Sequence, residues 1–172
     1  ASILVTASGS AALTITDVVA SAGTLTVDGS LATGTVEVSG AADWTGVVSI
    51  TGGTGNDTIT SGTGNDIIVG GAGEDNIDSG TGNDSIDGGS GYDTVYYQDC
   101  QTGIVANLQT GVVSNDGLGG ADTVVNVEGI HGASLANSGD HITLSNLGGY
   151  VFARAGNDTL VCGSGNDRFH SG

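Results

Sequence analysis

Residues 52–96 read GGTGNDTIT SGTGNDIIV GGAGEDNID SGTGNDSID GGSGYDTVY, which is five consecutive units of nine residues. In every unit the second and fourth positions are Gly, the sixth is Asp and the eighth is Ile or Val. A period sustained in this way is typical of a repeat architecture, in which each unit packs on its neighbours. The rest of the chain is therefore interpreted by how closely it keeps this period.

Each unit divides into a turn and a very short strand. Gly at positions 2 and 4 permits positive φ and close backbone approach, so GGxGxD is expected to form a tight turn. The last three residues then form a strand whose position-8 side chain points inward. Two units make one coil of 18 residues, and the coils stack by parallel pairing about 4.8 Å apart. The sequence thus predicts an all-β fold, a right-handed parallel β-roll or β-solenoid.

The position-6 aspartates alternate between the two edges of this roll. Asp57, Asp75 and Asp93 fall on one edge, and Asp66 and Asp84 fall on the other. Stacked carboxylates about 5 Å apart repel by about 1 kcal/mol per pair in water, and by more when partly dehydrated. Turn carbonyls point into the same gaps, and a flexible all-oxygen cage selects Ca²⁺ over Mg²⁺. Several calcium ions are therefore the expected cofactor.

The expected calcium ligands form two groups. Those of the perfect block are the five aspartates, stacked as Asp57 with Asp75, Asp66 with Asp84 and Asp75 with Asp93, and the turn glycines Gly53, Gly55, Gly62, Gly64, Gly71, Gly73, Gly80 and Gly82. Weaker candidates lie further along the chain, namely Asp122 facing Asp140, Asp140 facing Asp158, and Asp167.

The flanking segments keep the period less well. Residues 1–51 contain five short apolar or Thr-rich runs, so we expect a β-rich N-terminal segment, either a continuation of the solenoid or a sandwich-like cap. Nine-residue steps from Val95 reach Ile104 and Val113, and residues 97–139 are expected to be degenerate rungs with a small insertion. Residues 140–172 contain further calcium-binding repeats, and Ser171-Gly172 resembles the start of another unit, so we expect a segment of a longer protein.

The charge balance excludes several classes of partner. The chain has 19 acidic residues against two basic ones, a net charge of −17. Binding to phosphate backbones needs basic surface, so no nucleic acid is expected. No run of about 18 apolar residues is present, so no membrane insertion is expected. A self-repelling anionic chain instead requires cations.

No catalytic constellation is visible in the sequence. The three histidines, His131, His141 and His170, belong to no HExxH motif, and no GxSxG is present. We therefore expect no enzyme activity and no catalytic residue. The two cysteines, Cys100 and Cys162, are too few for a disulfide framework and lie too many coils apart to bond with one another.

The unit resembles the repeat-in-toxin (RTX, haemolysin-type) nonapeptide GGxGxDxUx of bacterial calcium-binding exoproteins. Strict matches cover seven units, five in 52–96 and two in 153–170. The stretch GADTVVNVEGIHG, residues 120–132, resembles the degenerate linker of such proteins, and residues 1–51 resemble strands of bacterial surface-layer proteins. The resemblance implies a parallel β-roll, calcium bound by the motif aspartates and turn carbonyls, and a secreted or cell-surface location.

These observations favour a calcium-binding structural module that folds and becomes rigid on calcium. Its expected setting is a secreted or cell-surface bacterial protein, with a surface-layer or extracellular matrix or filament component preferred. The partners expected besides calcium are copies of itself, other surface proteins or polysaccharide. Two alternatives stay open: an accessory RTX module of a secreted enzyme or toxin, and an adhesin or ice-binding segment.

Overall fold

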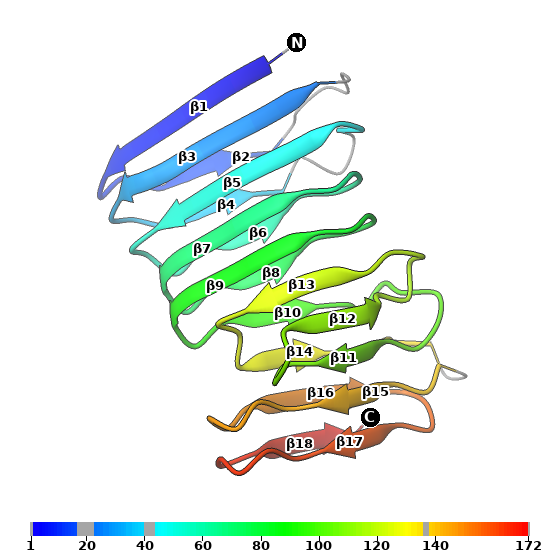
Figure 1. Ribbon diagram of the computed structural model, residues 1–172. Helices are drawn as coiled ribbons and strands as arrows, with labels where there is room; N and C mark the ends of the chain where they lie inside the picture. Colours follow the sequence, from blue (N-terminus) through cyan, green and yellow to red (C-terminus); the bar gives the residue numbers. More distant parts are fainter. Residues whose placement is uncertain (1, 17–22, 40–43, 136–137, 172) are drawn as a thin grey trace.

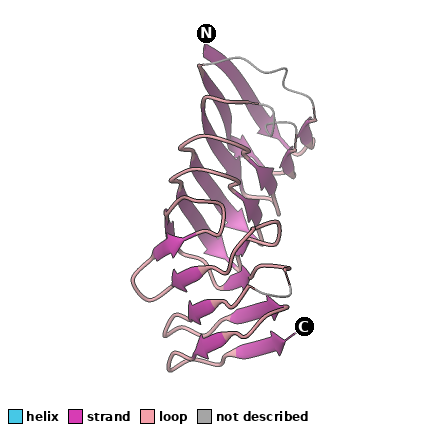
Figure 2. Ribbon diagram, turned by 90° about the vertical axis from the view of Figure 1, so that its right-hand side faces the viewer, coloured by secondary structure: helices cyan, strands magenta, loops and turns pink. Residues whose placement is uncertain are grey.

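The computed structural model describes residues 2–16, 23–39, 44–135 and 138–171, and in these residues it contains strands and turns but no helix. The strands stack one below another from the N-terminal to the C-terminal end (Figure 1). The view turned by 90° shows the coils and their connecting turns piled along the same axis (Figure 2). Ala1 and Gly172, the outermost residues of the two flanking segments, lie outside the described residues.

Two sheets face each other in the described residues. Sheet A has ten strands, in the spatial order β1 (Ser2–Gly9), β3 (Thr24–Ala32), β5 (Val47–Gly53), β7 (Ile67–Gly73), β9 (Ser85–Gly91), β13 (Asp122–Val125), β12 (Val112–Asn115), β11 (Val105–Asn107), β15 (His141–Thr143) and β17 (Thr159–Val161). Sheet B has eight, in the order β18 (Arg168–Ser171), β16 (Tyr150–Arg154), β14 (Gly129–His131), β10 (Thr94–Tyr96), β8 (Asn76–Asp78), β6 (Thr58–Thr60), β4 (Val36–Val38) and β2 (Leu13–Ile15).

The register of sheet A confirms the coil length predicted for the repeat block. Ile50 pairs with Ile68, and Ile68 pairs with Ile86, all in parallel strands, so each coil takes 18 residues. The chain therefore forms a parallel β-solenoid in which consecutive strands alternate between the two sheets, except for β11, β12 and β13, which all lie in sheet A. The same spacing returns near the C-terminus, where Ile142 pairs with Leu160.

The N-terminal segment continues the solenoid. Of the two alternatives expected for it, a solenoid or a sandwich-like cap, the structure shows the first. β1, β3 and β5 pair in parallel, and β2 pairs in parallel with β4. The coils are longer here: Leu25 pairs with Val48, 23 residues further on. Trp44 lies at the junction with the repeat block, fully buried, and its indole N–H donates to the Gly23 carbonyl over 3.3 Å.

Between the two repeat blocks, two extra strands are inserted into sheet A. β12 pairs antiparallel with both β11 and β13, whereas β13 pairs in parallel with β9. Val124 consequently pairs with Ile86 across 38 residues of chain instead of 18. Sheet B has no such insertion, because β10 pairs directly with β14. Ile104 and Val113 are buried as the nine-residue steps suggest, but the antiparallel β12 means that they are not successive rungs.

The core is a narrow double column of aliphatic side chains. All five position-8 residues, from Ile59 to Val95, are no more than 1% exposed, which confirms their predicted inward direction. Sheet A contributes Leu25, Val27, Val48, Ile50, Ile68, Ile86 and Val124, and sheet B contributes Val36, Val38, Ile59, Ile77, Val95, Ile130 and Val151. Each coil thus buries few apolar atoms, and the turns on both edges hold the remaining buried groups.

The described part of the chain contains no helix long and apolar enough to cross a membrane.

Candidate metal sites

From Gly62 to Gly91 the position-2 and position-4 glycines of the repeat turns have the positive φ that the motif predicts, whereas Gly53 and Gly55 of the first unit do not. At position 2, φ is +100° at Gly62 and +116° at Gly71, and at position 4 it is +130° at Gly64 and +138° at Gly73. Side chains of L-residues rarely tolerate this region, so Gly is required at these turns. A positive φ at both positions curls the turn and directs its carbonyl groups along the axis of the roll.

The same glycines let successive turns approach closely. A Cβ atom at Gly71 would overlap the carbonyl oxygen of Gly53, and one at Gly82 would overlap that of Gly64. The carbonyl oxygens of position 2 and position 4 therefore lie directly against the turn of the next coil. Each edge of the solenoid carries columns of backbone oxygens in the places where the sequence predicts ligands.

Carboxylates form a ladder on the first edge, which carries the turns leading from sheet A to sheet B. The backbone N–H of Asp57 donates to Oδ1 of Asp75 over 2.8 Å, and that of Asp75 donates to Oδ1 of Asp93 over 2.9 Å. The ladder begins at the N–H of Val36, 2.7 Å from Oδ1 of Asp57. It ends at Glu128, whose Oε2 accepts the N–H of Asp93 over 3.0 Å.

The second edge carries an equivalent ladder. The N–H of Asp66 donates to Oδ1 of Asp84 over 2.8 Å, and the N–H of Asp84 donates to Oδ1 of Asp122 over 2.9 Å. Asp122 was expected to face Asp140, but the inserted strands β11 and β12 separate the two, and it stacks on Asp84 instead. Asp140 does stack on Asp158, because its N–H donates to Oδ1 of Asp158 over 3.0 Å.

The second oxygen of each repeat carboxylate is buried without a hydrogen-bond donor. Asp57, Asp66, Asp75, Asp84 and Asp93 are at most 3% exposed, and Oδ2 of each has no partner among the described residues. On the first edge this oxygen lies near a backbone carbonyl of the next coil: Oδ2 of Asp75 and the Gly88 carbonyl oxygen both lie within 2.6 Å of the point where a Cβ on Gly70 would sit. Two acceptors facing each other without a donor are unfavourable unless a cation lies between them.

Burial raises the pKa values of these carboxyl groups. For Asp84 the loss of solvation, with added repulsion from Asp122 and Asp66, raises the pKa to about 7. For Asp93 burial, with repulsion from Asp75 and Glu128, raises the pKa to about 6. Burial therefore disfavours the charged form of these carboxylates, and a bound cation would favour it and reverse the shift.

Asp122 and Asp140 differ from the repeat aspartates because protein donors reach both of their oxygens. Oδ2 of Asp122 accepts the hydroxyl group of Tyr97 over 2.8 Å. Oδ2 of Asp140 accepts the N–H of Ala133 over 3.0 Å. These two carboxylates therefore need a cation less than the repeat aspartates do. The remaining candidates, Asp158 and Asp167, are only half-buried.

Sequence reasoning missed two acidic residues that belong to these edges. Glu128 takes the place of a motif aspartate at the end of the first ladder. A signal for it exists, because Glu128 precedes the buried Ile130 by two residues, as Asp93 precedes Val95. Asp116 is fully buried beside the second edge but sits outside the nonapeptide pattern, so its position depends on the inserted strands.

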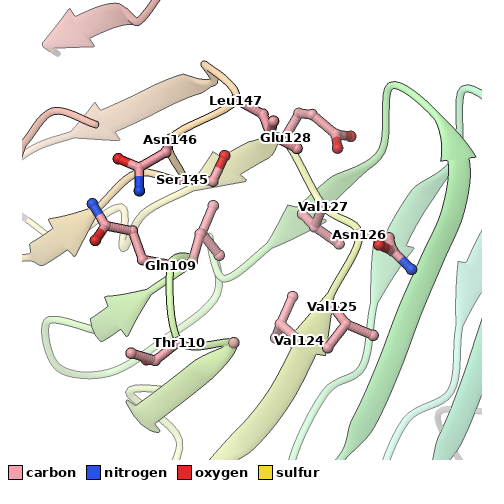
Figure 3. A pocket seen from close by; sticks show the side chains of 12 residues that line it. Gln109, Thr110, Val124, Val125, Asn126, Val127, Glu128, Ser145, Asn146 and Leu147 are labelled. Carbon is pink, nitrogen blue, oxygen red and sulfur yellow. The ribbon is translucent and has the colours of Figure 1, made fainter. Parts of the chain in front are cut away.

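A groove opens where the first edge loses a regular turn. Only residues 126–128 connect β13 to β14, whereas residues 144–149 connect β15 to β16. The resulting recess has a volume of about 380 Å³, and Val124, Asn126, Glu128, Ser145 and Leu147 are among the side chains around it (Figure 3). The groove lies where the first ladder ends at Glu128.

The arrangement fits a hard cation bound by oxygen. The donors available in the turns are carboxylate oxygens and backbone carbonyls, which suit Ca²⁺. Among the described residues, no three His, Cys, Asp or Glu side chains converge closely enough to hold an ion by themselves. Backbone carbonyls would therefore complete each site, as the glycine-rich turns allow.

Fold and sites together define a parallel β-solenoid whose turns are lined with buried carboxylates and glycine carbonyls. Residues 49–77, 60–95 and 150–172 match the family described as the RTX calcium-binding nonapeptide repeat (4 copies). The chain thus carries RTX nonapeptide repeats in both blocks, as the resemblance of its sequence predicted. A comparison with the curated proteins finds no match.

Proposed function

We propose that the chain is a calcium-binding structural module of a secreted or cell-surface bacterial protein. The observation that carries the proposal is the set of five repeat carboxylates, Asp57 to Asp93, each buried with one oxygen that has no donor among the residues that the structure describes. The net charge of −17 adds a general need for cations. The match to the RTX calcium-binding repeat supports calcium as the ion.

Calcium acts here as a folding ligand. A small aliphatic core leaves little free energy to overcome the desolvation and mutual repulsion of the turn carboxylates. Extracellular calcium sites bind with Kd values of roughly 10⁻⁴ to 10⁻³ M, so at about 1 mM calcium each occupied site stabilises the fold by about 0.5–1.5 kcal/mol. Several sites along the two ladders together stabilise the whole stack of coils.

A chelator titration followed by far-ultraviolet circular dichroism tests this function. In excess EDTA the β signal should collapse, and adding calcium back should restore it, whereas the same concentration of magnesium should restore far less. An unchanged β signal in EDTA would remove the calcium-folding proposal. A parallel titration of a repeat-free β protein would control for effects of the chelator on the spectrum.

For the setting of this module we propose a surface-layer or extracellular matrix or filament component. The solenoid extends through strands β1 and β3, which carry the exposed apolar side chains Ile3, Leu4 and Leu31. Exposed apolar groups of this kind suit contacts with neighbouring molecules. Electron microscopy of the chain before and after calcium addition tests it: ordered lattices or filaments support the proposal, and dispersed particles oppose it.

A further inference from the structure

Asp116 is a buried acid outside the nonapeptide motif. It follows β12 directly and starts the turn that leads to Asp122 and β13. Its side chain is 0% exposed, although no strand of the regular solenoid carries it. The family match covers residues 60–95 and 150–172 around it and does not include it.

The two oxygens of the Asp116 carboxylate have different surroundings. Oδ1 accepts the backbone N–H groups of Leu118, Gly119 and Gly120 over 2.7, 2.9 and 2.9 Å, which fixes the shape of the turn. Oδ2 is buried and has no hydrogen-bond partner among the described residues. Shaping the turn therefore uses one oxygen and leaves the other without compensation.

Oδ2 of Asp116 faces another acceptor. It and the carbonyl oxygen of Gly82, in the repeat turn of the previous coil, lie 2.6 and 1.7 Å from the point where a Cβ on Gly120 would sit. Two oxygens in this arrangement repel each other unless a donor or a cation lies between them. The Gly82 carbonyl belongs to the turn of Asp84, whose own Oδ2 also has no donor in the described part of the chain.

Two buried uncharged donors in this region are already used elsewhere. The Tyr97 hydroxyl group donates to Asp122, and the Cys100 thiol donates to the backbone carbonyl of Asp116 over 2.6 Å. Burial and the surrounding carboxylates, first among them Asp116, raise the pKa of Cys100 to about 12, so it stays a neutral thiol. The only two basic side chains, Arg154 and Arg168, belong to β16 and β18 of sheet B.

We propose that Oδ2 of Asp116 is a ligand of an additional divalent-cation site, held between the 79–84 turn and the 116–122 turn with the Gly82 carbonyl. The site is of the oxygen-only kind that takes calcium. It extends the proposed calcium function, on which it rests, from the nonapeptide repeats to the inserted strands. Calcium at this position ties the insertion to the regular coil above it.

The test compares calcium stoichiometry in two matched variants. Asp116→Asn keeps an Oδ1 acceptor for the three N–H groups and replaces Oδ2 with an NH₂ group that can donate to the Gly82 carbonyl. Asp99→Asn removes the same charge from an exposed position nearby. Native mass spectrometry in calcium should count one ion fewer per chain for Asp116→Asn than for wild type, and the wild-type number for Asp99→Asn.

Equal ion counts in Asp116→Asn and wild type would overturn the proposal and leave Asp116 a turn-shaping residue. Absence of bound calcium in the wild-type chain would overturn the general calcium function as well, so the two failures are distinguishable. Should Asp116→Asn not reach the wild-type β signal in calcium, Asp116→Ser serves instead, because its hydroxyl group also accepts N–H donors in such turns. The expected loss of one ion is the same.

Discussion

The Tyr97 hydroxyl group donates a 2.8 Å hydrogen bond to Oδ2 of Asp122, the oxygen that in the repeat aspartates has no hydrogen-bond donor among the described residues. The phenol is buried and its pKa is raised well above its usual value, because burial and the nearby carboxylates of Asp122 and Asp116 disfavour the phenolate. Tyr97 thus remains a donor. It does for Asp122 what we propose calcium does for the aspartates of the regular turns.

Replacing Tyr97 by Phe should therefore destabilise the folded chain. The change leaves Oδ2 of Asp122 buried without a donor, which costs about 1–3 kcal/mol. Tyr96→Phe is the matched control, because it removes an exposed hydrogen bond from the Tyr96 hydroxyl to Oδ1 of Asn76. Denaturant unfolding in saturating calcium measures the free energy of unfolding of both variants. An equal loss of stability in Tyr97→Phe and Tyr96→Phe would contradict this role of Tyr97.

Asp75 occupies the middle of the first ladder, so its replacement tests the calcium sites themselves. Asp75→Asn keeps an acceptor for the N–H of Asp57 but removes the charge and replaces Oδ2, which has no donor among the described residues, with an NH₂ group. We expect the calcium concentration at half-maximal β signal to rise by about threefold to tenfold, equivalent to about 0.7–1.4 kcal/mol.

Glu74→Gln is the control for Asp75→Asn. It removes the same charge from the adjacent exposed position, so its calcium titration should overlay that of wild type. If the two variants shift the midpoint equally, net charge alone explains the calcium dependence, and the ladder carboxylates have no special part in it.

The regular coils could be predicted from the sequence because the turn glycines, the inward apolar residues and the aspartates all indicate the same 18-residue coil. Positive φ at Gly71, the inward direction of Ile77 and the stacking of Asp57 on Asp75 all follow from one nine-residue pattern. The pattern also located the first ladder, although the hydrogen bond from each Asp N–H to the next carboxylate was not foreseen. That bond depends on the exact approach of two coils, which periodicity does not specify.

The inserted strands could not be predicted in the same way. Nine-residue steps identify Ile104 and Val113 as inward-facing, yet a strand buries alternate residues whichever way it runs. The antiparallel direction of β12 is set by the turns around it and by long-range pairing with β13. For this reason Asp122 was assigned to the wrong neighbour, and Asp116 was missed altogether.

The calcium-free fold should respond to pH in the opposite sense to an ordinary acid-labile protein. Burial raises the pKa of Asp84 to about 7 and the pKa values of Asp122 and Asp140 to about 6, whereas an unfolded Asp titrates near 3.9. Between these values the folded chain binds more protons than the unfolded chain, so folding stability rises as pH falls and is lost as pH rises through the folded pKa values.

Far-ultraviolet circular dichroism in calcium-free buffer, from about pH 8 down to about pH 5, measures this effect. We expect β signal to increase toward the lower pH, and the calcium midpoint to increase as well, because protons compete with calcium for the same oxygens. A calcium-free β signal that declines on acidification would contradict the assignment of these carboxylates as the groups that oppose folding.

Arg154 stands at position 2 of a repeat, where the motif has Gly, and it adopts φ of +62°. A non-Gly residue in this region costs about 1–2 kcal/mol. Two contacts offset the cost: the Arg154 guanidinium donates to Oε1 of Gln98 over 2.7 Å and lies 5.1 Å from the centre of the Phe152 ring. Arg154→Gly should therefore change the free energy of unfolding by less than about 1 kcal/mol, since strain and contacts are lost together.

Gly71→Ala makes the reverse change at an equivalent position and should have a large effect. Gly71 has φ of +116°, and a Cβ there would overlap the Gly53 carbonyl oxygen, with no flexible side chain available to move aside. We expect a loss of about 2 kcal/mol or more in saturating calcium, from backbone strain and separation of the two coils. Denaturant unfolding of both variants decides the matter: a Gly71→Ala loss as small as that of Arg154→Gly would mean that the close stacking of turns contributes little to stability.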